Sequence, residues 1–161
     1  MSLTIPYAEP VARLTDRLFG LWPASLTLLL LRLTLALPFW KSGLTKWDGW
    51  FTLSFGATAL FTDEYKLHLF GAEIPFPYPE QMALASALAE TILPILLVLG
   101  LGTRFAALGL LGMTAVIQLV YPDGWQNFHL PWAAMALALV SFGGGRLSLD
   151  AVLGLDRAPG R

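Results

Sequence analysis

The 161-residue sequence contains no cysteine, few charges and no excess of either charge sign. The absence of cysteine excludes disulfides, thiolate nucleophiles, and iron–sulfur clusters or thiol relays held by this chain, so redox chemistry would need a borrowed group. A formal net charge of −1 and the lack of a basic run exclude nucleic-acid binding as a function class. Only 13% of the residues are charged, against roughly 25% in soluble domains, and 56% are hydrophobic. This composition belongs in a lipid bilayer.

Four apolar stretches come close to the length of about 20 residues that a helix needs to cross a membrane. They cover residues 21–44, 82–101, 105–121 and 125–142. Short links join the second stretch to the third and the third to the fourth, and short links force neighbouring helices to run antiparallel. The sequence therefore predicts one domain over residues 1–161, an all-α four-helix bundle integral to the membrane.

The placement of lysine and arginine predicts the orientation of this bundle. Residues 1–23 carry charges and lack a small-residue cleavage site after a short apolar core, so we expect them to be retained. An N-terminus inside puts six basic residues in the cytoplasm and three outside. The six are Arg13, Arg17, Arg104, Arg146, Arg157 and Arg161, and the three are Lys41, Lys46 and Lys66. We therefore expect both termini to be cytoplasmic (N-in/C-in).

The long connection over residues 47–81, which this topology places outside, has two different halves. The first, "WFTLSFGATALFTDEYKL" (50–67), can form a short amphipathic helix in the membrane interface. The second, "FGAEIPFPYPEQ" (70–81), has three prolines and should be extended. The connection is either an interfacial cap or the cover of a site.

Arg32 and Glu90 lie inside the first and second apolar stretches and are the strongest pair of candidate residues. An ionised side chain at the bilayer centre costs about 2.5–3.5 kcal/mol, so such residues face the bundle and find partners. Helical rise places both near mid-membrane, which predicts an intramembrane Arg32–Glu90 pair. The pair is either a structural clamp between two helices or a site where Glu90 accepts a proton and Arg32 holds an anionic or carbonyl-bearing ligand.

Three further residues are candidates for handling a ligand, a quinone or protons. Lys46 can reach the interface or can stand above Arg32 in a polar track. Gln118 lies on a small, weakly polar stripe that suits hydrogen bonding between helices. His129, which we expect close in depth to Gln118, can donate to a quinone carbonyl or relay a proton, or can simply be interfacial. We assign no catalytic residue and no metal ligands, since no metal-ligand spacing or nucleophilic triad is present.

Several segments in order resemble the DoxX family of small four-span bacterial membrane proteins. They are "FWKSGLTKW" (39–47), "AETILPILLVLGLGTRFAALGLLGM" (89–113), "YPDGW" (121–125) and "GGGRLSLD" (143–150). The resemblance implies a single DoxX-like transmembrane domain in the bacterial inner membrane. It also implies an association with quinone-linked oxidation of sulfur compounds or with thiol and oxidant stress. The chain looks closest to the branch with "DEYKL" (63–67), whose genes tend to lie beside those of metal-responsive secreted peptides.

Two functions remain open on the sequence. The first is a membrane subunit of a quinone-linked redox, oxidant, sulfur or metal-stress system, an oxidoreductase subunit that depends on a bound quinone or a redox partner protein. The second is a non-enzymatic scaffold or small-solute carrier. No covalently bound cofactor is expected, and self-association into a homo-oligomer is compatible with either function.

Overall fold

The computed structural model describes residues 23–155. The predictions that fall on residues 1–22 and 156–161, including the retained N-terminus and Arg13, Arg17, Arg157 and Arg161, lie outside the described residues.

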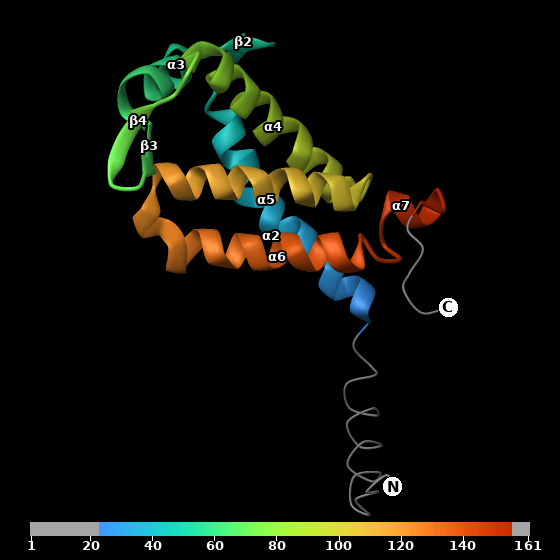
Figure 1. The fold of residues 1–161 in the computed structure, drawn as a ribbon. Helices are drawn as coiled ribbons and strands as arrows, with labels where there is room; N and C mark the ends of the chain where they lie inside the picture. The colour runs from blue at the N-terminus through green and yellow to red at the C-terminus, as the bar shows by residue number, and fades with distance from the viewer. Residues whose placement is uncertain (1–22, 156–161) are drawn as a thin grey trace, which may run out of the picture.

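Four helical segments form the body of the molecule (Figure 1). They are α2 (Ala24–Leu44), α4 (Pro79–Leu99), α5 (Thr103–Val120) and α6 (Leu130–Phe142), and η3 (Trp125–His129) leads directly into α6. Helix α2 packs on α4 and α6, and α5 packs on α4 and α6, so the four close into a ring. Consecutive helices run antiparallel, as the short links predict (Figure 1).

The bounds of these helices match the predicted stretches within a few residues. Pro79 takes the first helical position of α4, where its missing N–H costs nothing. Among the described residues, α2, α4 and α5 are long and apolar enough to cross a membrane. The core between the helices consists of small and branched apolar side chains, with Leu35, Leu97, Leu110 and Leu139 fully buried.

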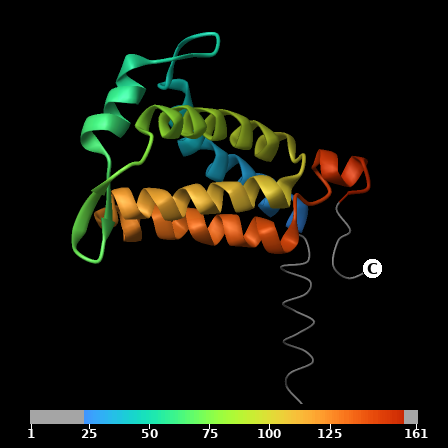
Figure 2. The ribbon, with the colours of Figure 1, turned by 45° about the horizontal axis from the view of Figure 1, so that its top comes forward.

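The long connection forms a folded unit over one end of the bundle, and we call residues 45–78 the cap (Figure 2). Strands β1 (Trp47–Gly49) and β2 (Thr52–Leu53) form a hairpin, followed by α3 (Phe55–Ala59) and the π-helix η1 (Leu60–Glu64). The predicted helix in the first half is thus shorter than expected. The second half is extended, as predicted, and pairs as the hairpin β3 (Lys66–Leu69) and β4 (Ala72–Pro75).

Helices α2 and α4 are strongly staggered. A Cβ atom on Gly43 would lie 2.7 Å from the carbonyl oxygen of Glu90, so the two backbones touch there. This contact comes one residue before the end of α2 but eleven residues after the start of α4. About 16 Å of α4 therefore lies on the cap side of the contact. The cap covers this projecting part, where α3 and η1 pack against α4.

The end opposite the cap is closed by the short helix α7 (Leu149–Val152), which we call the α7 end (Figure 1). Ser148 caps α7 by accepting a hydrogen bond from the Ala151 amide at 3.2 Å. The Asp150 carboxylate accepts hydrogen bonds from the amides of Gly102 and Thr103 at 2.7 and 2.8 Å. These are donors that the first turn of α5 would otherwise leave unpaired. One carboxylate thus fixes α7 to the start of α5.

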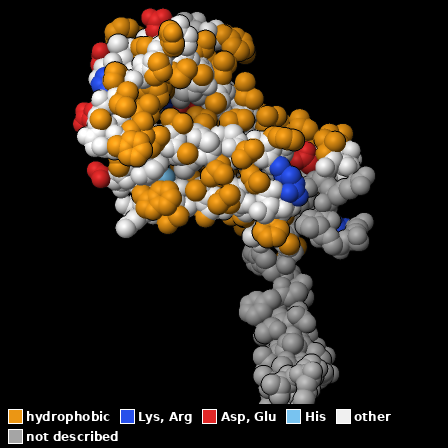
Figure 3. Space-filling model, in the orientation of Figure 1, with side chains coloured by type: hydrophobic (Ala, Val, Ile, Leu, Met, Phe, Trp, Pro, Cys, Tyr) orange, Lys and Arg blue, Asp and Glu red, His pale blue; other side chains and the backbone are white. Residues whose placement is uncertain are grey.

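The distribution of surface charge suits a bilayer. In Figure 3 hydrophobic side chains cover the long flank of the molecule, and charged side chains gather at its two ends. Leu30, Leu37, Ile92 and Leu108 are examples of exposed apolar residues on the helices. Such exposure is favourable only where lipid replaces water.

Candidate functional site

A cavity of about 1120 Å³ lies between the four helices and the cap. Its walls are mainly apolar and aromatic, and they include Phe39, Phe61, Phe76, Met113, Phe128 and Trp132. Known small-molecule sites are clefts of this kind, lined by hydrophobic side chains with a few convergent polar groups.

The polar focus of the cavity is a buried ion pair between Lys46 and Glu90. The Lys46 Nζ atom lies 2.7 Å from Glu90 Oε2, and each side chain is 6% exposed. Ser86 donates to Glu90 Oε1 at 2.8 Å, and Lys46 donates to Ser42 at 3.0 Å. Each oxygen of the Glu90 carboxylate thus has a hydrogen-bond donor, as a buried carboxylate requires. Lys46 does not reach out to the interface, because its carboxylate partner lies inside the cavity.

The predicted Arg32–Glu90 pair is wrong. Arg32 donates to the carbonyl oxygens of Leu97 at 3.4 Å, Val98 at 3.2 Å and Leu147. Leu97 lies seven residues after Glu90, which is about 10 Å along the helix. The prediction assumed that α2 and α4 end at the same level, whereas their stagger brings Glu90 opposite the last turn of α2.

Arg32 has a structural place at the α7 end. Its side chain is fully buried, and its acceptors include carbonyls of the last turn of α4. Those carbonyls have no partner within their own helix, and a cation there also complements the helix dipole. Arg32 also donates to the carbonyl oxygen of Leu147, so it joins α2, α4 and the segment before α7. It does not line the cavity.

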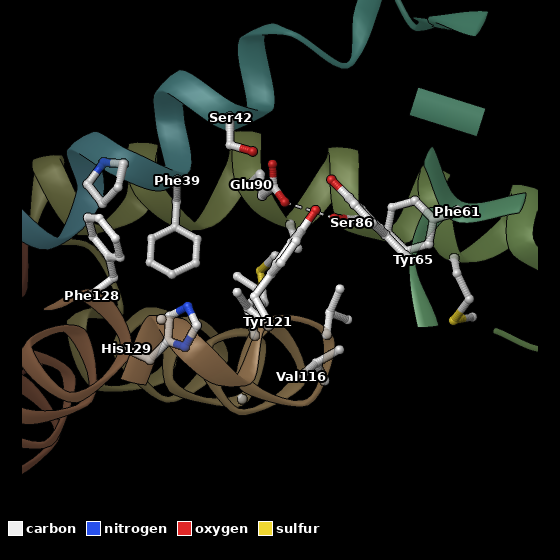
Figure 4. A pocket seen from close by; sticks show the side chains of 18 of the residues that line it. Phe39, Ser42, Phe61, Tyr65, Ser86, Glu90, Val116, Tyr121, Phe128 and His129 are labelled. Atoms are coloured by element: carbon white, nitrogen blue, oxygen red, sulfur yellow. Dashed lines mark hydrogen bonds between the residues drawn. The ribbon is translucent and has the colours of Figure 1, made fainter. Parts of the chain in front are cut away.

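Two tyrosines from different elements point at the ion pair. Figure 4 shows Tyr65 of the cap and Tyr121 at the end of α5 with their hydroxyls directed toward Ser86 and Glu90. The two rings lie edge to face with centroids 5.7 Å apart. Burial raises the pKa of Tyr65, and Tyr121 and the carboxylates of Glu90 and Glu64 raise it further. The Tyr65 phenol therefore stays protonated and can donate a hydrogen bond.

His129 lies on another wall of the cavity and contacts Gln118, in agreement with their predicted closeness in depth. His129 is 3% exposed, and its Nδ1 atom lies 2.6 Å from Gln118 Oε1. Gln118 donates its Nε2 amide to the Pro122 carbonyl at 3.0 Å, so Oε1 is the acceptor for His129. This arrangement leaves the other ring nitrogen, Nε2, for a ligand or water. Figure 4 shows Glu90 and His129 on opposite sides of the cavity.

The structure therefore brings Lys46, Glu90 and His129 together around one cavity, with Gln118 bonded to His129 but outside the cavity lining, and it places Arg32 elsewhere. Sequence reasoning missed Tyr65, Tyr121 and Ser42 as parts of this site. Tyr121 belongs to the "YPDGW" segment, but an interfacial tyrosine is common in membrane proteins and has no distinct pattern. Tyr65 could not be placed, because nothing in the cap sequence predicts how the cap folds over α4.

Comparison with known proteins supports the expected family. A protein of Haemophilus influenzae (strain ATCC 51907 / DSM 11121 / KW20 / Rd), described as uncharacterized, is 33% identical over 144 residues. The match covers 81% of this chain and 85% of that protein. No solved structure matches the chain. The family model described as DoxX matches residues 27–122, more than half of the sequence, and this chain is a membrane protein that belongs to the DoxX family.

Proposed function

We propose that this chain is a multi-pass protein of the bacterial inner membrane that binds a quinone in its cavity and serves as the membrane subunit of a redox system. The observation that carries the proposal is a large apolar cavity with a buried ion pair in its wall. The chain holds no cysteine, so electrons come from a partner protein or a reduced substrate.

In the proposed topology α6 is a fourth span and the cap faces outward. The five residues of η3 and the thirteen of α6 continue as one helical segment over residues 125–142. Eighteen residues reach about 27 Å, close to the thickness of the hydrocarbon core. Arg104 and Arg146 lie at the α7 end, and by the positive-inside rule that end is cytoplasmic.

The polar groups suit the two ends of a quinone ring. Its carbonyl oxygens lie on opposite sides of a flat apolar ring, and the cavity has polar groups on opposite walls. Lys46 and Tyr65 can donate hydrogen bonds to one carbonyl. When the quinone takes up two electrons and two protons, the Glu90 carboxylate can accept a hydrogen bond from the hydroxyl that forms there. His129, with Nδ1 directed to Gln118, accepts from the second hydroxyl through Nε2. Aromatic walls stack on the ring between them.

The two alternatives fit the cavity less well. A scaffold requires a closed bundle, whereas here an open volume reaches the ion pair. A carrier requires a path to the α7 end, but fully buried side chains such as Leu97, Leu110 and Leu139 fill the core. Arg32, at that end, does not contact the cavity.

Binding of decylubiquinone to the purified protein in lipid nanodiscs tests the proposal. Trp132 lines the cavity, so bound quinone should quench tryptophan fluorescence in a saturable manner. Glu90→Gln should weaken this binding by about tenfold, the loss of roughly 1.4 kcal/mol. Glu80→Gln is the matched control, because Glu80 is exposed on the same helix and outside the cavity.

Two results would refute the proposal. One is the absence of saturable quenching in the wild-type protein. The other is equal affinity in the Glu90→Gln and Glu80→Gln variants, provided that circular dichroism shows the same helix content in both.

A further inference from the structure

The cavity has an opening on the lipid-facing flank of the bundle, between α4 and α5. Ala85 of α4 and Gly112 and Val116 of α5 line the cavity and are also exposed on the outside. A residue that contacts both the interior and the exterior lies at a mouth. In Figure 3 the surface is hollowed between α4 and α5.

The register of the two helices places these residues opposite one another. A Cβ atom on Gly109 would lie 2.8 Å from the Leu93 side chain, so α4 and α5 touch there. One helical turn closer to the cap, Ala89 of α4 lies level with Gly112, and the next turn brings Ala85 level with Val116. A Cβ atom on Gly112 would meet nothing within 4 Å. The helices therefore separate from Gly109 toward the cap.

The cap closes the cavity on the side away from the bundle. The Phe61 ring lies edge to face with the rings of Phe76 and Tyr65, with centroids 5.3 and 5.1 Å apart. The Tyr65 ring in turn lies against that of Tyr121. His68 of β3 bonds the Leu119 carbonyl at 3.1 Å through Nδ1, which fixes this hairpin to α5. These contacts roof the cavity, whereas alanine and glycine border its flank.

We propose that the ligand enters sideways from the bilayer through this gap between α4 and α5, and that the cavity selects amphiphiles with a polar ring and a long apolar tail. The ring reaches Lys46 and Glu90, and the tail stays in lipid beside Ala85 and Gly112. The inference rests on the proposed quinone site and names its access route and substrate class.

The rate of quinone association tests the route separately from the site. Gly112→Leu fills the gap with a side chain, and it replaces a helical glycine by a better helix former. A blocked gap should slow both association and dissociation of decylubiquinone by about fivefold or more, whereas a merely weakened site would speed dissociation. Ala115→Leu is the control, because Ala115 is exposed on α5 but does not line the cavity. Its rates should match those of the wild type.

A second variant tests the same gap from the other helix. Ala85→Leu narrows the gap from α4 and should slow association and dissociation in the same way. Unchanged rates in Gly112→Leu and Ala85→Leu, with helix content equal to that of the wild type, would overturn the lateral route. If Glu90→Gln still weakens binding in that case, the quinone site stands and only the route fails. If the wild-type protein binds no quinone, both proposals fail.

Discussion

Replacing Lys46 by methionine measures how strongly the buried ion pair stabilises the fold. The ammonium and carboxylate lie 2.7 Å apart, and both side chains are 6% exposed. Removing one partner of such a pair costs roughly 3–5 kcal/mol, because the other charge is left without its partner away from water. Glu90 keeps the Ser86 hydroxyl, so we expect Lys46→Met to cost about 3 kcal/mol, the lower end of that range.

The double variant Lys46→Met, Glu90→Leu separates the pair from its surroundings. It removes both charges together, so no unpaired charge remains in the cavity wall. The double variant should lose less free energy of unfolding than Lys46→Met alone. This outcome requires a coupling energy between Lys46 and Glu90 of about 2 kcal/mol or more. The assay is reversible unfolding of the purified protein in mixed micelles by increasing SDS, followed by far-ultraviolet circular dichroism.

Lys41→Met provides the control, because Lys41 is exposed in the last turn of α2. A surface charge contributes about 0–1 kcal/mol, and the control should fall in that range. The reasoning is refuted if Lys46→Met costs no more than Lys41→Met. Additive effects of the two single changes in the double variant would refute it equally, since they would show that Lys46 and Glu90 do not interact.

Three further predictions concern the fold. Asp150→Asn should cost about 1.5–3 kcal/mol in the same assay, because Asp150 bonds two amides at the start of α5. Burial opposes ionisation of Asp150, but these hydrogen bonds and the charge of Arg32 lower its pKa below the ordinary value of 3.8. Its stabilisation is therefore complete above pH 3.8 and lost as the pH falls through the lowered pKa; Asp150→Asn should lack this acid dependence. Gly43→Ala should destabilise by about 1–3 kcal/mol, because its Cβ would press on the α4 backbone, whereas Gly112→Ala should be neutral or stabilising. Finally, a cysteine placed at Asp63 should react in whole cells with a membrane-impermeant maleimide and one at Arg146 should not; the reverse pattern would overturn the proposed orientation.

The helices could be predicted from the sequence because each apolar stretch is a local property of the chain. An apolar length near 20 residues and a short polar link can each be recognised within one segment of the sequence. The observed helix bounds therefore differ from the predicted ones by only a few residues. The predicted closeness of Gln118 and His129 was correct for the same reason. Only eleven residues separate them, and one tight link joins α5 to η3.

The partners of Arg32 and Glu90 could not be predicted, because the register between α2 and α4 is a tertiary property. The link between these helices is long and imposes no register. Gly43 decides it instead, by allowing α2 to contact the Glu90 backbone near its own end. A glycine in an apolar helix is common and does not reveal which residue will lie against it.

The wrong partner predicted for Glu90 and the unexpected length of the connection between α2 and α4 have one physical cause. Because α4 projects about 16 Å past its contact with α2, its first turns need other residues to cover them. The cap supplies these residues, and η1 and α3 pack there. The same stagger carries Ser86 past the end of α2 and leaves Glu90 opposite the last turn of α2, where Lys46, just after α2, can reach the carboxylate. A connection too short to fold over this projection would leave the first turns of α4 uncovered. The long connection is therefore a requirement of the site, because it lets a charged pair lie inside an apolar cavity at one end of the bundle.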